Sequence, residues 1–187
     1  MRTKAYLAMA ILGVLCLAVM FSAMAKDQPA PAPAAAPAKG PTMLLPVTLM
    51  ASVEIKAPVE KVFKYGTNAA NLPKWMPECK SVTDIQAKGL GQTFHWAVEV
   101  DGQKIEGQSV VVDYVLNKRE EVLDTDGTSW VILYLPAAGG GTKLMMNYQV
   151  HLVVPAQDPT AWPEVIKKNQ ERFQGWANNI KAEVEKK

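Results

Sequence analysis

The chain has 187 residues, and its 20 lysines and arginines nearly balance its 18 aspartates and glutamates. Most nucleic-acid-binding proteins gather a basic excess on one face, because phosphate contacts supply much of their affinity. Nucleic acid is therefore not an expected partner. Two cysteines, Cys16 and Cys79, are too few for a disulfide framework, so a hydrophobic core has to stabilise the fold.

Residues 1–25 have the pattern of a secretory signal peptide. Arg2 and Lys4 precede an almost wholly apolar run over residues 5–25, which ends in the small-x-small sequence Ala-Met-Ala. Cleavage before Lys26 is the favoured interpretation and predicts an exported, periplasmic protein. The alternative is an uncleaved anchor in the inner membrane, because a run of 21 residues is long enough to span a bilayer.

Residues 26–42 are rich in proline and alanine, a composition typical of an extended spacer. Residues 43–187 are expected to form one α+β domain without an internal repeat. A domain of this size can bury roughly 68–70% of the surface that its unfolded chain exposes, which is sufficient without disulfides.

A strand and two short helices are expected to begin this domain. Alternating apolar residues predict a strand over residues 47–56. Pro58 suits the first position of a helix, where its missing N–H has no helical partner, and Gly66 is a typical residue to end it. A second short helix is predicted over residues 68–76.

Six further strands and a long C-terminal helix are expected to follow. Asp101-Gly102 and Asp126-Gly127 between alternating segments are typical of hairpin turns, so neighbouring strands should be antiparallel. The glycines at 139–141 indicate another hairpin loop, and the helix should start near Thr160. The predicted strands span residues 80–87, 92–100, 103–116, 119–124, 128–135 and 143–154.

The turn at Asp101-Gly102 predicts the register of its hairpin. It pairs Val100 with Gln103 as the first pair and Phe94 with Ser109 as the seventh. One face of the hairpin is then polar, and the other is an inner, apolar face. The apolar face holds Phe94, Trp96, Val98, Ile105 and Val111.

The C-terminal helix carries an apolar stripe opposite its lysines and glutamates. At 100° per residue the apolar side chains fall on one side, and Asn169 lies in the middle of them. A polar amide at that position needs a reason, and contact with a ligand is one. The stripe consists of Trp162, Val165, Ile166, Phe173, Trp176, Ala177, Ile180 and Val184.

Five segments together carry a family resemblance over nearly the whole chain after the spacer: IKAPVEKVFKYGTNAANLPKWMPE, GQTFHWAVEVDG, VVVDYVLNKR, GGGTKL and WANNIKAEVE. Their order resembles the helix-grip fold of the START-like, or SRPBCC, superfamily. Within it, the sequence is similar to the polyketide cyclase/dehydrase and lipid transport family. None of the segments is a catalytic signature.

The resemblance implies a curved sheet that wraps around the long helix and leaves a hydrophobic cavity, with the two short helices closing one end. Aromatic residues that point inward could line this cavity or simply fill a core, and the resemblance favours lining. The expected cavity residues are Phe63, Trp75, Phe94, Trp96, Ser109, Trp130, Tyr134, Met146, Tyr148, Asn169, Phe173 and Trp176.

The sequence gives no catalytic residue, metal ligand or cofactor that we would assign. The hairpin register places His95 on the outer face, and His151 alternates out of phase with the apolar residues of its strand. The triple glycine precedes a strand, whereas a phosphate loop needs a following helix. Cys79 has no histidine expected near it and is interpreted as an unreactive thiol.

The expected function is an exported binding or carrier protein for a hydrophobic small molecule or lipid. The alternative is a cyclase or dehydratase acting on a polyketide-like substrate, for which Asp113 and Tyr148 are the only acid/base pair to nominate. Asp113 points inward only if the hairpin register continues unbroken. A third alternative is a structural envelope module with a fully packed core.

Overall fold

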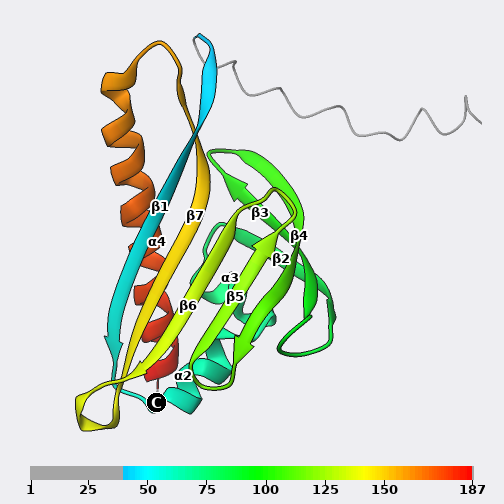
Figure 1. The fold of residues 1–187 in the computed structure, drawn as a ribbon, viewed down its shortest axis with the longest axis vertical. Coiled ribbons are helices and arrows are strands. Elements are labelled where there is room, and N and C mark those ends of the chain that lie inside the picture. The colour runs from blue at the N-terminus through cyan, green and yellow to red at the C-terminus, as the bar shows by residue number, and fades with distance from the viewer. Residues whose placement is uncertain (1–39, 187) are drawn as a thin grey trace, which may run out of the picture. The chain divides into compact units, whose positions relative to one another are not determined.

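In the computed structural model, residues 40–186 form a curved antiparallel sheet that wraps around one long helix (Figure 1). The sheet has seven strands in the order β1-β7-β6-β5-β4-β3-β2, and two short helices lie at one end of it. This arrangement confirms the expected α+β helix-grip fold. The predicted signal peptide, residues 1–25, and most of the predicted spacer, residues 26–42, lie outside the described residues.

Every neighbouring pair of strands is antiparallel, as the hairpin signals predicted. Strands β1 and β2 form the two edges of the sheet. The strands are β1 (Thr42–Ile55), β2 (Cys79–Gln86), β3 (Thr93–Val100), β4 (Gln103–Val115), β5 (Arg119–Asp124), β6 (Ser129–Pro136) and β7 (Thr142–Pro155).

Strand β1 starts at Thr42, five residues before the predicted start at residue 47. It pairs with β7 along its whole length, from Thr42 opposite Pro155 to Ile55 opposite Thr142. Pro46 concealed this extension, because proline cannot donate to a ladder and argues against a central strand. The edge position of β1 leaves one side of the strand unpaired, where a missing N–H is tolerated.

The helices follow the predicted order with small shifts. Pro58 is the N-cap residue of α2, one position before the predicted one, with extended backbone angles. The predicted helix over residues 68–76 is divided into a 3-10 turn and a short α-helix. The elements are α2 (Val59–Gly66), η1 (Ala69–Asn71), α3 (Leu72–Trp75), η2 (Ala138–Gly140), η3 (Pro159–Ala161) and α4 (Trp162–Glu185). No helix within residues 40–186 is both long enough and apolar enough to cross a bilayer.

Gly66 is the last residue of α2, but it is not the residue that terminates the helix. The helix is terminated by Thr67, whose backbone N–H and hydroxyl both donate to the carbonyl of Phe63, at 2.9 and 2.8 Å. Gly66 instead makes room for Tyr134, because a Cβ atom at residue 66 would lie 2.5 Å from the Tyr134 hydroxyl oxygen. The glycine therefore serves the packing of helix on sheet.

The register of the β3–β4 hairpin agrees with the prediction at every pair from Val100–Gln103 to Phe94–Ser109. Beyond it, β4 contains a bulge opposite β5, between Val111 and Asp113. An extra residue in one strand reverses the facing of the residues that follow. Tyr114 consequently packs inward against the core, at a ring distance of 5.2 Å from Phe63.

Asp113 is therefore not an inward carboxylate, and its nomination as part of a catalytic pair is wrong. Its side chain is 36% exposed and forms an ion pair with Arg119 at 3.0 Å. It does not line the cavity described below. The bulge is the physical reason, because it interrupts the alternation on which the nomination depended.

The apolar stripe of α4 is buried unevenly along its length. From Phe173 onward its apolar side chains are buried against the sheet and the short helices. In the first turns, Trp162, Val165, Ile166 and Asn169 are only partly buried. The helix and the sheet are therefore closely packed toward the C-terminal end of α4, and a cavity lies beside the middle of the helix, from Asn169 to Trp176.

Candidate ligand-binding cavity

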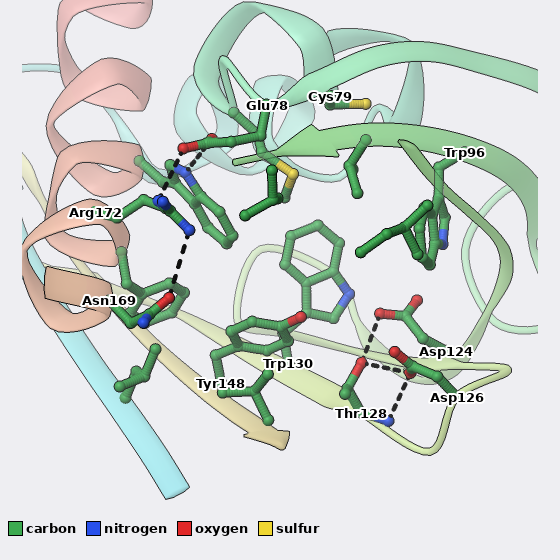
Figure 2. Close-up of a pocket in the computed structure, with 18 of the residues that line it drawn as sticks. Glu78, Cys79, Trp96, Asp124, Asp126, Thr128, Trp130, Tyr148, Asn169 and Arg172 are labelled. Atoms are coloured by element: carbon green, nitrogen blue, oxygen red, sulfur yellow. Dashed lines mark hydrogen bonds and ion pairs between the residues drawn. The ribbon is translucent and has the colours of Figure 1, made fainter. Parts of the chain in front are cut away.

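A cavity of about 420 Å³ lies between the inner face of the sheet and α4. Small-molecule sites typically enclose ~300–1,000 Å³ and are lined mainly by apolar and aromatic side chains. This cavity fits that description, since its walls include leucines, valines and the indole rings of Trp96, Trp130 and Trp176. Figure 2 shows these walls together with the polar groups among them.

Seven of the twelve expected cavity residues line this space, and together they come from the sheet and from α4. They are Trp96, Ser109, Trp130, Tyr148, Asn169, Phe173 and Trp176. The other five, which do not line it, are Phe63, Trp75, Phe94, Tyr134 and Met146.

These five residues are packed in the core below the cavity. There α2 and α3 close directly on the sheet, and Phe63 contacts Tyr134 edge-to-face at a ring distance of 4.9 Å. Trp75 lies against Trp130 at 5.4 Å. The facing of each side chain was predicted correctly, but strand alternation does not show at which depth the short helices fill the space.

Leu72 and Trp130 line both the cavity and a void of about 10 Å³ deeper in the core. Trp75, Phe94 and Glu120 also line this void. Glu120 is only 5% exposed, and burial raises the pKa of its carboxyl group to about 8. The indole nitrogens of Trp75 and Trp130 are buried without a hydrogen-bond partner among the described residues.

One corner of the cavity is acidic and is built by the middle of β4, the end of β5 and the turn between β5 and β6. The Trp96 indole N–H donates to the Ser109 hydroxyl at 2.9 Å, and that hydroxyl donates to Asp124. The Thr128 hydroxyl lies 3.1 Å from the other carboxylate oxygen of Asp124 and 2.8 Å from Asp126. We call Ser109, Asp124, Asp126 and Thr128 the acidic corner.

Burial raises the pKa of Asp124, although the hydrogen bonds from Ser109 and Thr128 oppose the shift. Burial likewise raises the pKa of the Tyr148 phenol to about 12, so this hydroxyl stays protonated and able to donate at neutral pH. Figure 2 shows the Tyr148 hydroxyl, the Trp130 indole nitrogen and the Asp124 carboxylate turned toward the same space.

A second polar group lies on the helix side of the cavity. The Arg172 guanidinium binds Glu78 through Nε at 3.2 Å, and the Trp176 indole donates to the other Glu78 oxygen at 3.0 Å. The side-chain oxygen of Asn169 accepts a weak bond from Arg172 at 3.4 Å, and its amide nitrogen donates to Val165 of the preceding turn at 2.8 Å. Asn169 thus lines the cavity, but its polar atoms already have protein partners.

Six polar residues of the cavity were missed at the level of sequence: Glu78, Asp124, Asp126, Thr128, His151 and Arg172. The acidic corner surrounds Asp126-Gly127, which was interpreted only as a turn. Arg172 could have been found, because it lies three residues after Asn169 and four before Trp176 on the same side of the helix. The sequence does not indicate that Glu78 would meet it.

His95 lies where the register placed it, whereas His151, which was expected to point outward, is exposed but contributes to the lining of the cavity. His95 is exposed on the outer face and contacts Asp84 at 3.0 Å, and His151 is exposed at the rim of the cavity. Within residues 40–186, no three His, Cys, Asp or Glu side chains are grouped so that they could hold a metal ion. Cys79 is buried beside the cavity, and burial raises the pKa of its thiol.

The sequence from residue 46 to residue 185 matches the family described as polyketide cyclase / dehydrase and lipid transport. The chain belongs to this family, as its segments predicted. The fold is a ligand-binding fold, and proteins of the family generally bind hydrophobic molecules. A comparison with curated protein sequences found no match.

Solved structures share the fold at low sequence identity. The protein TTHA0849 from Thermus thermophilus is 19% identical with a TM-score of 0.63, and the match covers 74% of this chain and 97% of that one. The ZhuI aromatase/cyclase from a Streptomyces species is 16% identical with a TM-score of 0.61, over 75% of this chain and 94% of that one. A START superfamily protein from Mycobacterium smegmatis is 17% identical with a TM-score of 0.58, over 74% and 97%.

Proposed function

We propose that the protein binds a hydrophobic small molecule or lipid in the cavity between the sheet and α4 and acts as its carrier. The observation that carries this proposal is the cavity of about 420 Å³, walled by aromatic and aliphatic side chains. Moving apolar surface out of water contributes on the order of 25 cal/mol per Å². A ligand that fills the cavity would gain affinity in this way without any reactive group.

Native mass spectrometry tests the proposal directly. The purified protein is incubated with a membrane lipid extract, and we expect one bound species per chain. Val98 lines the cavity, whereas the next residue, Glu99, is exposed on the opposite face of β3. The variant V98W should lose the bound species because its indole fills the space, and the matched variant E99W should keep it. Recovery of the wild-type protein without any adduct would contradict the proposal.

The alternative function, a cyclase or dehydratase acting on a polyketide-like substrate, is supported by one observation of its own. Asp124 is a carboxylate inside the cavity, held by two hydroxyl groups, and Tyr148 lies close by. Asp124 replaces the excluded Asp113 as the acid/base candidate. Incubation with a synthetic poly-β-keto thioester tests it: a cyclised product that disappears in D124N would favour the enzyme, and no product above the buffer blank would reject it.

We further propose that the carrier is exported to the periplasm, with anchoring in the inner membrane as the alternative. The support is the sequence pattern of residues 1–25, which has the charge, apolar run and small residues of a cleavable signal. N-terminal sequencing of the protein recovered from cell fractions tests this. A mature N-terminus at Lys26 in the periplasmic fraction is expected, and an intact N-terminus in the membrane fraction would support anchoring instead.

A further inference from the structure

The charged groups of the cavity have an uneven balance. Its lining contains three carboxylates, on Glu78, Asp124 and Asp126, and one guanidinium, on Arg172. Arg172 is already paired with Glu78 at 3.2 Å. The charge left without a partner in the cavity wall is therefore negative and lies at the acidic corner. An anionic head group would have to leave water beside a like charge, which is unfavourable.

A hydrogen-bond donor without an acceptor in the described part of the chain lies beside the acidic corner. Trp130 is only 6% exposed, and its indole nitrogen has no partner among residues 40–186. Figure 2 shows this nitrogen turned toward Asp124. Buried donors in folded proteins almost always have an acceptor. Among the unpaired buried polar side chains of residues 40–186, Trp130 is the one that lines the cavity, where a ligand atom can supply the acceptor.

Asp124 offers the complementary acceptor in a fixed position. The Ser109 hydroxyl of β4 and the Thr128 hydroxyl, in the turn before β6, each contact one of its carboxylate oxygens and so restrain the orientation of the carboxylate. Each carboxylate oxygen has two lone pairs, and one hydroxyl donor leaves room for a further donor. Asp124 thus offers an acceptor, and Trp130 a donor, to the same ligand group.

The head groups of common apolar molecules differ in how well they can bond to both the Asp124 carboxylate and the Trp130 indole N–H. A carboxylate or an ether oxygen can only accept, and an ammonium group can only donate, whereas a hydroxyl group does both. We infer that the cavity selects a neutral apolar molecule carrying a hydroxyl group, an alcohol or a phenol. Its hydroxyl donates to Asp124 and accepts from Trp130, and its hydrocarbon part lies against the apolar wall. This inference rests on the proposed function and names its ligand class.

Four ligands with the same alkyl chain test the inference on the wild-type protein by isothermal titration calorimetry at pH 7.5. They are 1-decanol, decyl methyl ether, decanoate and decylamine. We expect 1-decanol to bind most tightly, with the ether about tenfold weaker and decanoate weaker still. Equal affinities for the alcohol and the ether, or tightest binding of decanoate or decylamine, would overturn the inference and leave the carrier function standing. Absence of binding by all four would contradict both.

Two variants test whether Trp130 and Asp124 are responsible for the tight binding of 1-decanol. W130F keeps an aromatic wall but removes the N–H, and D124L removes the acceptor with little change of volume. In D124L the affinity for 1-decanol should fall about tenfold, to that for the ether, whose own affinity should stay the same. In W130F both ligands should bind more weakly, because both accept from the indole N–H. The control is W162F, because Trp162 lies outside the cavity and donates to Pro155. An unchanged preference for the alcohol in D124L, or unchanged affinities of both ligands in W130F, would contradict the inference.

Discussion

Among single side chains, Glu120 lies in the least usual surroundings. It is 5% exposed, and burial raises the pKa of its carboxyl group to about 8. In the unfolded chain this group titrates near its ordinary value of 4.5. Between these two pH values the unfolded chain has released the proton and the folded protein still holds it. The free energy of unfolding therefore falls as the pH rises through this window.

The variant E120Q should abolish this part of the pH dependence, because an amide has the same shape and does not titrate. Each unit of pKa difference corresponds to about 1.4 kcal/mol, so wild type should lose roughly 3–5 kcal/mol relative to E120Q between pH 5 and pH 8. Urea denaturation at several pH values measures the difference. E99Q is the control, since Glu99 is exposed and its replacement should leave the pH profile unchanged. Parallel profiles for wild type and E120Q would show that Glu120 is ionised in the folded protein.

The packing of α2 on the sheet depends on the absence of a side chain at its last residue. A Cβ atom at Gly66 would lie 2.5 Å from the Tyr134 hydroxyl, which is buried without a partner among the described residues. A Cβ atom at Gly175, within α4, would meet nothing within 4 Å. Replacing these two helical glycines by alanine should therefore change the stability of the protein in opposite directions.

G66A should destabilise the protein by about 1–3 kcal/mol through overpacking. G175A should stabilise it by about 0.5–1 kcal/mol, because alanine has the higher helix propensity. Thermal unfolding followed by circular dichroism measures both. The double variant G66A/Y134F should recover a large part of the loss, since it removes the clashing hydroxyl. No recovery would mean that the clash is not the cause.

The link between Glu78, Arg172 and Trp176 joins α4 to the segment between α3 and β2. The side chains of Glu78 and Arg172 are only 19% and 24% exposed, so their interaction is less screened than a surface ion pair. E78A should destabilise the protein by about 1–3 kcal/mol, because it leaves a partly buried guanidinium without its partner. K104A, which breaks an exposed pair with Glu106, should change stability by less than about 0.5 kcal/mol. Equal effects in chemical denaturation would contradict this account.

For the molecule as a whole, local signals were sufficient to predict the element order and the hairpin register. Asp101-Gly102 fixes the pairing of β3 with β4 because a two-residue turn leaves no freedom in the alignment. The bulge at Val112 could not be predicted in the same way. Val110, Val111 and Val112 are consecutive valines, so an apolar residue is present on either face and the pattern hides the reversal.

The cavity was predictable as a feature of the fold, but its polar groups were not. Trp96, Tyr148 and Phe173 were expected because facing follows from periodicity. The acidic corner depends on the meeting of Ser109 with Asp124, fifteen residues apart, and the helix-side link depends on Glu78 and Trp176, which are 98 residues apart. Such pairs are set by tertiary packing, which no local pattern records.

The measurement that tests the cavity most directly is a titration of the ¹⁵N-labelled protein with 1-decanol, followed by the indole N–H signals of its five tryptophans. Trp96, Trp130 and Trp176 line the cavity, whereas Trp75 and Trp162 do not. Saturable shifts of the first three signals, with little change in the other two, are the predicted result. Shifts confined to Trp162 and to surface amides, with the three cavity indoles unchanged, would show that no ligand enters between the sheet and α4.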